Sequence, residues 1–229
     1  MKILCIIITA IMDLCLKVVY KMQNKTLFFC IFIELSAILF FTDLQFTAFF
    51  LCFILVGILK LVSGRLRKKS DVSEYLISNF VYSAGLPLIF SYLHCFIIQK
   101  EMQSTLNYLV ICSLAALIAD TASSEVGQWF KCKTYSIFSL KKTVQGMDGG
   151  VSLNGFIGSV ICIIIYLTIF TIFYNLNFQN FALIFFASEI SNLADSILGA
   201  TVQKKGYLNN EQVNFVAILL SNVLFLLLY

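Results

Sequence analysis

The segment "VSLNGFIGSVICIIIYLTIFTIFY", residues 151–174, decides the fold class of this protein. It contains no charged side chain and no proline over its whole length. The hydrocarbon core of a bilayer is about 30 Å thick, and a helix needs roughly 20 apolar residues to cross it. The segment therefore predicts a transmembrane helix.

Other stretches of the chain have the same character. The sequence is 60% hydrophobic and 12% charged, whereas soluble domains are about 45–50% apolar and about 25% charged. This composition excludes the water-soluble class. We predict an all-α, polytopic bundle of about eight spans (seven to nine), which forms one integral-membrane domain over residues 1–229. The candidate spans are residues 3–20, 27–41, 44–61, 75–98, 106–126, 151–174, 178–199 and 213–228.

Basic residues alternate between the predicted loops, and this alternation gives an orientation. The loops that follow the first, third, fifth and seventh spans hold most of them, whereas the loops between hold only Lys100. The positive-inside rule then places the N-terminus outside, and the basic loops, with any active site there, in the cytoplasm. The net charge of +4 is mostly a topology signal, so we expect no nucleic acid as a partner. The basic loop residues are Lys21, Lys25, Arg65, Arg67, Lys68, Lys69, Lys131, Lys133, Lys141, Lys142, Lys204 and Lys205.

Cysteine labelling tests this orientation. A cysteine introduced at position 68 should resist a membrane-impermeant reagent added to intact cells, because its loop is predicted to be cytoplasmic. A cysteine at position 103 should react. The reverse pattern would overturn the topology.

Charged residues inside a membrane are costly, and each is a functional candidate. The span at 106–126 ends in "ADTASSEVGQ", which carries Asp120 and Glu125. These residues lie about 140° apart on an ideal helix, so they flank one site only if the helix end is bent or unwound; otherwise they serve neighbouring sites. The span at 178–199 carries Glu189, Asn192 and Asp195 at a spacing of three residues, which places them on one helix face.

Two sequence features near these carboxylates leave alternatives open. "ADTASSEVGQ" and "ADSILGATVQ" (194–203) match either as a parallel internal repeat or through shared helix-end composition. "KKTVQGMDGGVSLNG", residues 141–155, is rich in glycine and begins with two lysines. It either cradles phosphate through backbone amides, the lysines and the start of the next helix, or is a turn with its lysines on lipid headgroups. It lacks the P-loop pattern.

Four ordered blocks resemble the signatures of domain-of-unknown-function family 92, an integral-membrane family that includes animal transmembrane protein 19 and the plastid phytyl-phosphate kinase. The blocks are "ADTASSEVGQ", "KTVQGMDGGVSLNGFIGS", "ADSILGATVQ" and "GYLNNEQVNFVAILLSN". An upstream element carries Asn79. The resemblance covers about residues 65–220, and no signature is identified in the spans within residues 1–61. The sequence departs from the family pattern at Met147 and at Glu189.

The resemblance implies a phosphotransferase that uses Mg²⁺ and a nucleoside triphosphate, CTP or another, on an isoprenyl or other lipid phosphate. The characterised plant member phosphorylates an isoprenyl monophosphate. The family is also similar to dolichol kinase, phytol kinase and CDP-diacylglycerol synthase, whose sites face the cytoplasm. The rival hypothesis is a transporter or lipid carrier, since carboxylates within the membrane also occur there.

The enzyme hypothesis assigns a role to each candidate residue. Asp120, Glu125 and Asp195 are the catalytic and metal-binding carboxylates, and Asp148 is a further metal candidate. The residues assigned to binding the nucleotide phosphates are Lys141, Lys142, Gly146, Asp148, Gly149, Gly150 and Asn154. Further polar contacts fall to Asn79, Gln203 and Asn214.

Overall fold

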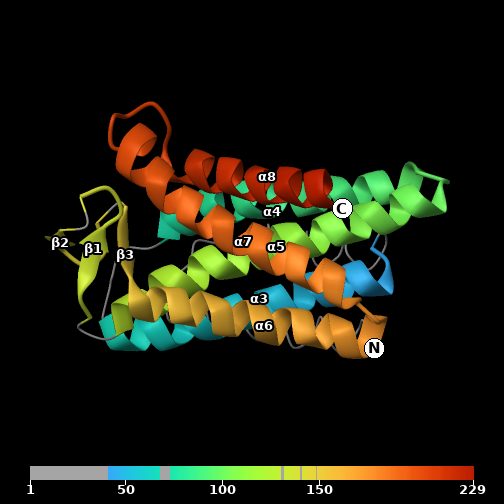
Figure 1. The fold of residues 1–229 in the computed structure, drawn as a ribbon, viewed down its shortest axis with the longest axis horizontal. Coiled ribbons are helices and arrows are strands. Elements are labelled where there is room, and N and C mark those ends of the chain that lie inside the picture. The colour runs from blue at the N-terminus through green and yellow to red at the C-terminus, as the bar shows by residue number, and fades with distance from the viewer. Residues whose placement is uncertain (1–40, 68–72, 130–131, 140, 148) are drawn as a thin grey trace. The chain divides into compact units, whose positions relative to one another are not determined.

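A computed structural model describes residues 41–67, 73–129, 132–139, 141–147 and 149–229, and side chains only outside residues 64–83. The chain is predominantly helical (Figure 1). One turn of π-helix, η1, directly continues α7. The helices are α3 (Asp43–Arg67), α4 (Ser73–Phe96), α5 (Lys100–Trp129), α6 (Leu153–Tyr174), α7 (Phe178–Leu198), η1 (Gly199–Gln203) and α8 (Asn210–Leu228).

Helices α3 to α8 coincide with the six predicted spans from residues 44–61 onward. Five helices among the described residues are long and apolar enough to cross a membrane, namely α3, α5, α6, α7 with η1, and α8. The helical, multi-pass character is therefore confirmed. The predicted spans at 3–20 and 27–41 lie outside the described residues, apart from residue 41, and the total of about eight spans stays a prediction.

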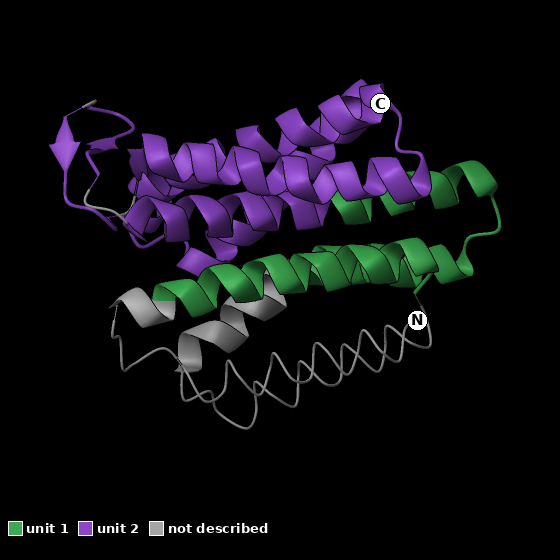
Figure 2. Ribbon diagram, turned by 90° about the horizontal axis from the view of Figure 1, so that it is seen from below, with its two compact units in different colours: residues 1–111 green, residues 112–229 purple. Residues whose placement is uncertain are grey.

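The chain divides into two compact units, residues 1–111 and 112–229, and the division falls within α5 (Figure 2). In the first unit, the side-chain amide of the buried Gln45 donates to Asn107 Oδ1 at 2.9 Å, which joins the start of α3 to α5. The ring of Phe41 stacks on Phe49 with a centroid distance of 4.8 Å. Every candidate site residue except Asn79 belongs to the second unit.

Glycines let α5 and α6 approach each other closely in the second unit. A Cβ added at Gly155 would lie 2.6 Å from the Ser123 carbonyl oxygen, and one added at Gly158 would lie 2.7 Å from Val126 Cβ. Both distances are shorter than atoms tolerate, so only hydrogen fits at these positions. Small residues at such contacts are typical of helix pairs in membranes, where association depends on close packing.

Helices α7 and α8 pack together and are tied by a buried hydroxyl, because Ser191 Oγ donates to the Ala217 carbonyl at 2.6 Å. The chain enters α8 through a capping box. Asn209 Oδ1 accepts from the Gln212 amide at 2.8 Å, and Gln212 Oε1 accepts from the Asn209 amide at 2.9 Å. Such caps satisfy backbone groups that the first helical turn leaves open. Part of the fourth signature block, "NNEQ", is therefore a helix start.

A small three-stranded sheet connects α5 to α6 and lies at one end of these helices (Figure 1). Its strands are β1 (Thr134–Ser136), β2 (Lys142–Thr143) and β3 (Gly150–Ser152), in the order β2-β1-β3, and both pairings are antiparallel. Thr134 lies opposite Thr143 on one side and Ser152 on the other. The purely α-helical prediction missed this sheet, because strands of two or three residues are too short to show an alternating pattern.

Candidate functional site

The glycines of the segment 141–155 stand where two successive β-turns need them. The Met147 amide donates to the Val144 carbonyl at 3.3 Å, and the Gly150 amide donates to the Met147 carbonyl at 2.9 Å. The third residues of these turns are Gly146, with φ of 84°, and Gly149, with φ of 73°. Positive φ at that position favours glycine. The three-residue spacing of the glycines is thus a consequence of two turns that share Met147.

The second turn packs against the end of α7. A Cβ added at Gly149 would overlap Ala200 Cβ and would come within 3.1 Å of the Ser196 carbonyl oxygen. The Gly149 carbonyl accepts from the Ile137 amide at 3.0 Å, which fixes the turn to the sheet. The structure therefore places the glycine turn against the helical turn that carries Asp195.

The same segment is anchored to the last turns of α5. The Gly127 carbonyl accepts from Gln145 Nε2 and from Cys132 Sγ. Ser152 caps the N-terminus of α6, because its Oγ accepts from the Gly155 amide at 3.2 Å. A Cβ added at Gly127 would lie 3.0 Å from that Oγ. The end of α5, the sheet and the start of α6 thus form one packed junction.

The turn of α5 that carries Asp120 meets α7 through Ser123. The Oγ atoms of Ser123 and Ser124 lie 3.0 and 2.7 Å from the Asp120 carbonyl oxygen. Ser123 Oγ also lies 2.9 Å from Asn192 Oδ1, one helical turn before Asp195. Asp120 and Asp195 are both half-buried. Two carboxylates far apart in the sequence therefore lie on helical turns that are linked by a hydrogen bond.

Glu125 is buried, with 8% of its surface exposed. Helix α5 remains α-helical through Trp129, so the angle of about 140° between Asp120 and Glu125 stands. The helix end is therefore not unwound between these residues, whereas a bent helix end and neighbouring sites both stay open. Among the described residues, no three His, Cys, Asp or Glu side chains lie close enough to hold a metal ion. Asp120, Glu125 and Asp195 therefore do not form a preassembled three-ligand centre.

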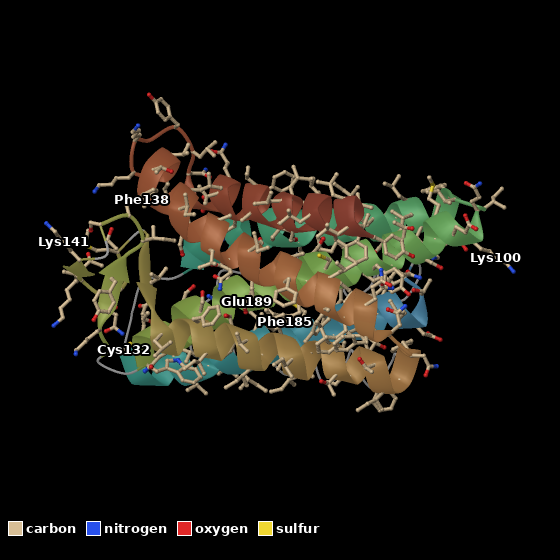
Figure 3. The ribbon with its side chains drawn as sticks, in the orientation of Figure 1. Lys100, Cys132, Phe138, Lys141, Phe185 and Glu189 are labelled. Atoms are coloured by element: carbon tan, nitrogen blue, oxygen red, sulfur yellow. The ribbon has the colours of Figure 1, made fainter. Side chains whose placement is uncertain are left out.

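The stripe on α7 continues from Asp195 into the interior of the second unit. Asn192 is 7% exposed and Glu189 is 6% exposed. Ser159 of α6 is fully buried, and its Oγ lies 2.9 Å from Glu189 Oε1 and 3.2 Å from Oε2. Figure 3 shows Glu189 along α7, away from the sheet where Lys141 lies. The sequence predicted this stripe, but it did not identify Ser159 and Ser123 as its partners.

The remaining candidates have different surroundings. Lys141 and Lys142 are exposed at the sheet. The amides of Met147 and Gly150 are used by the turns, so these two cannot also contact phosphate. Asn154 and Gln203 are half-buried in α6 and η1, and Asn214 is buried in α8. Asp148 and the side chain of Asn79 lie outside the described residues.

The internal repeat finds limited structural support. Gln128 and Gln203 both follow their aspartate by eight residues, but Gln128 lies in α5 whereas Gln203 ends the π-helical turn η1. The chain therefore differs in local structure where the two segments match in sequence. A repeat and a shared helix-end composition both stay open.

Comparison with known proteins gives a match over nearly the whole chain. The family described as Integral membrane protein DUF92 matches residues 6–222. The match begins well before residue 65, so it includes the N-terminal spans in which no signature was identified. No solved structure matches this chain.

Three named relatives are similar over different lengths. "Uncharacterized membrane protein MJ0933" of Methanocaldococcus jannaschii is 27% identical over 84% of this chain and 79% of its own length. "Protein VTE6, chloroplastic" of Arabidopsis thaliana is 30% identical over 52% of this chain and 36% of its own length. "Uncharacterized membrane protein sll0875" of Synechocystis is 31% identical over 45% of this chain and 41% of its own length. The chain thus matches less than half of the last two.

Proposed function

We propose that this chain, which belongs to the DUF92 family of integral membrane proteins, transfers a phosphoryl group from a nucleoside triphosphate to an isoprenoid or other lipid phosphate. The resemblance to a family with a phytyl-phosphate kinase supports the reaction class. The similarity to a chloroplast relative over half of this chain agrees with that class. CTP is the nucleotide that the wider resemblance implies.

One observation carries the proposal: the turns with Asp120 and Asp195 are linked by hydrogen bonding, and the glycine turn packs beside Asp195. Phosphoryl transfer depends on positioning and on charge stabilisation more than on a covalent nucleophile. The carboxylates can hold a metal ion, and the lysines of the neighbouring segment can hold phosphate oxygens. Lys141 and Lys142 are exposed there, which suits contacts to a nucleotide that arrives from water.

Mg²⁺ fits these residues in one particular way. It is usually held by one or two carboxylates together with water and substrate phosphates, without an all-protein cage. The separate carboxylates Asp120 and Asp195 match that donor set, whereas Glu125 lies on another face of α5. When bound, the ion neutralises charge that develops on the transferred phosphoryl group.

The remaining steps fall to the protein. Lys142 and Lys141 bind the phosphates of the nucleotide as point charges. Asp120 and Asp195 would position the acceptor phosphate only through the ion that they would hold, because a carboxylate and a phosphate repel each other directly.

The test is a transfer assay on the detergent-purified full chain. Radiolabelled CTP and ATP are incubated with Mg²⁺ and a panel of prenyl monophosphates of different chain lengths. We expect label in a lipid diphosphate. Absence of label in any lipid, with Mg²⁺ present, would overturn the proposal.

A transporter is the second candidate, and Glu189 is the observation that favours it. Its carboxylate is buried well inside α7, and carboxylates at such positions mark ion and proton pathways in transporters. Uptake of labelled prenyl phosphate into vesicles that hold the purified protein, without any transfer of label, would support this candidate.

Replacement of Lys142 by alanine should weaken nucleotide binding about ten- to a hundred-fold, as expected for the loss of one charge-assisted hydrogen bond. Arginine should restore part of the affinity, because the charge returns with a different geometry. Nucleotide KM in the transfer assay measures both effects. The matched control is Lys205→Ala, an exposed lysine of another loop. Full affinity in a Lys141→Ala, Lys142→Ala double variant would make the segment a lipid-anchored turn.

A further inference from the structure

We propose that Glu189 binds a proton in the folded protein and clamps α7 to α6 through that proton. Glu189 is 6% exposed and lies nine residues before the end of α7, or about 14 Å at 1.5 Å per residue. The proposed transfer reaction does not use this carboxyl group. Glu189 therefore has a role of its own, apart from the proposed function.

The helices of the second unit offer no cation to pair with Glu189. No lysine, arginine or histidine occurs in residues 112–129 of α5 or anywhere in α6, α7, η1 and α8. An isolated carboxylate in an apolar environment is costly, and such a group neutralises instead. The other titratable side chains of these segments are Cys112, Asp120, Glu125, Cys162, Tyr166, Tyr174, Asp195 and Glu211. None of them supplies a positive charge, so these helices favour a neutral Glu189.

Ser159 of α6 has more acceptors around it than hydrogens to donate. Its buried Oγ lies 2.8 Å from the Phe156 carbonyl oxygen, 2.9 Å from Glu189 Oε1 and 3.2 Å from Glu189 Oε2. A serine hydroxyl has one hydrogen and two lone pairs. If Glu189 were ionised, that single hydrogen would face three acceptor oxygens. At least one short contact between oxygens would then have no hydrogen of its own, which is unfavourable in a buried site.

A protonated Glu189 removes this mismatch. Its carboxyl O–H donates to Ser159 Oγ, and the Ser159 hydroxyl donates to the Phe156 carbonyl. Each of the two short contacts then contains one hydrogen, and the other carboxyl oxygen remains an acceptor. The proton is thus the group that joins α7 to α6 at this turn. Its loss would set two oxygens against each other at one of these contacts and weaken the clamp.

The clamp lies beside the close contact between α5 and α6. Ser159 follows Gly158, at which an added Cβ would lie 2.7 Å from Val126 Cβ. Successive residues of a helix point about 100° apart, so one turn of α6 contacts α5 and α7 in different directions. The proton of Glu189 therefore completes the packing of these three helices at this turn.

Substitutions separate the effect of a proton from the effect of a charge. Glu189→Gln has an NH₂ group that donates to Ser159 as the protonated carboxyl does, so the melting temperature in detergent should change by less than about 2 °C. Glu189→Ala removes the donor and leaves a cavity, so it should lower the melting temperature by at least about 4 °C. Ser159→Ala should lower it by about 2–4 °C. The matched control, Ser188→Ala, should change it less, because Ser188 is a buried hydroxyl that bonds to the Ile184 carbonyl of its own helix.

Infrared spectroscopy of the detergent-purified full chain at neutral pH detects the proton directly. Ordinary carboxyl groups are ionised there, whereas a protonated carboxyl group has a C=O stretching band of its own. We expect this band in the difference between the wild-type and Glu189→Gln spectra, because the other carboxyl groups cancel. Ser159→Ala should keep the band and shift its frequency, since the carboxyl O–H loses its acceptor. The control is Glu101→Gln, at an exposed position in the first turn of α5, which should leave the band intact.

A difference spectrum without this band would overturn the clamp. Equal destabilisation by Glu189→Gln and Glu189→Ala would also overturn it, because the negative charge would then be the essential feature. An unshifted band in Ser159→Ala would show that the proton does not lie on the Ser159 contact, with the same consequence. The glutamine and Ser159 variants decide the question even if Glu189→Ala does not fold. None of these measurements uses a nucleotide or a lipid phosphate, so failure of the transfer assay would overturn the proposed function alone.

Discussion

Replacement of Gly149 by valine should reduce phosphoryl transfer by about a hundred-fold or more while the helices still insert into the membrane. Two physical effects add at this position. A non-glycine residue at positive φ costs about 1–2 kcal/mol, and Gly149 has φ of 73°. Overpacking adds about 1–3 kcal/mol, because the new side chain would overlap Ala200. We therefore expect the segment 141–155 to lose its contact with the end of α7.

Gly206 offers a matched control for this variant. Its φ is 75°, but a Cβ there would meet no atom within 4 Å. Gly206→Val thus has the backbone strain without the overlap, and we expect near-normal activity. The transfer assay, together with proteolysis of the segment 141–155 in detergent, measures both variants.

A compensating change makes the mechanism testable. The atom nearest to a new Cβ at position 149 is Ala200 Cβ. Ala200→Gly should therefore restore part of the activity of Gly149→Ala, and the two changes should be coupled in a double-mutant cycle. Independent effects would show that the glycine is needed for another reason, such as close approach of a ligand.

Asp120→Asn and Asp195→Asn should each lower kcat by about a hundred- to a thousand-fold, the range found when one group of a preorganised electrostatic site is removed. The amide keeps the volume of the side chain but lacks the negative charge that attracts Mg²⁺. Thermal unfolding in detergent should change little. The double variant should be little worse than either single one, because groups that act as a unit are not additive.

Glu211→Gln is the control for the aspartate variants. Glu211 lies in the first turn of α8 and has no role in the proposed site. Its charge favours the helix N-terminus by about 0.3–1 kcal/mol, so the variant should lose a little stability and keep its activity. If Asp120→Asn keeps full activity while Glu211→Gln does too, Asp120 is not part of the active site.

The membrane helices could be predicted from the sequence more easily than the residues that surround the candidate site. Long apolar segments such as residues 151–174 predict membrane helices because the bilayer demands length and hydrophobicity. The sheet escaped detection because its pairing joins residues far apart, as with Thr134 and Ser152. The stripe of Glu189, Asn192 and Asp195 followed from helical spacing. Its partners Ser123 and Ser159 depend on tertiary packing, which no local pattern encodes.

The glycine segment shows why composition alone could not distinguish a phosphate-binding loop from a simple turn. Gly146 and Gly149 are explained by turn geometry, and Gly149 also by contact with Ala200. A ligand-binding glycine and a packing glycine look alike in a sequence, since both avoid a side chain. The structure accounts for these residues by packing, and the phosphate role rests on the lysines.

The close contact between α5 and α6 has a consequence for substrate selection. At Gly155 and Gly158 the space between these helices cannot accept even one methyl group. A polyprenyl tail is wider than a methyl, so it cannot slip between α5 and α6 from the bilayer at this level. If the chain acts on prenyl phosphates as proposed, discrimination by chain length arises on other helix faces. Variants that change lipid preference should map outside this pair of helices, whereas changes at Gly155 or Gly158 should impair all lipids alike.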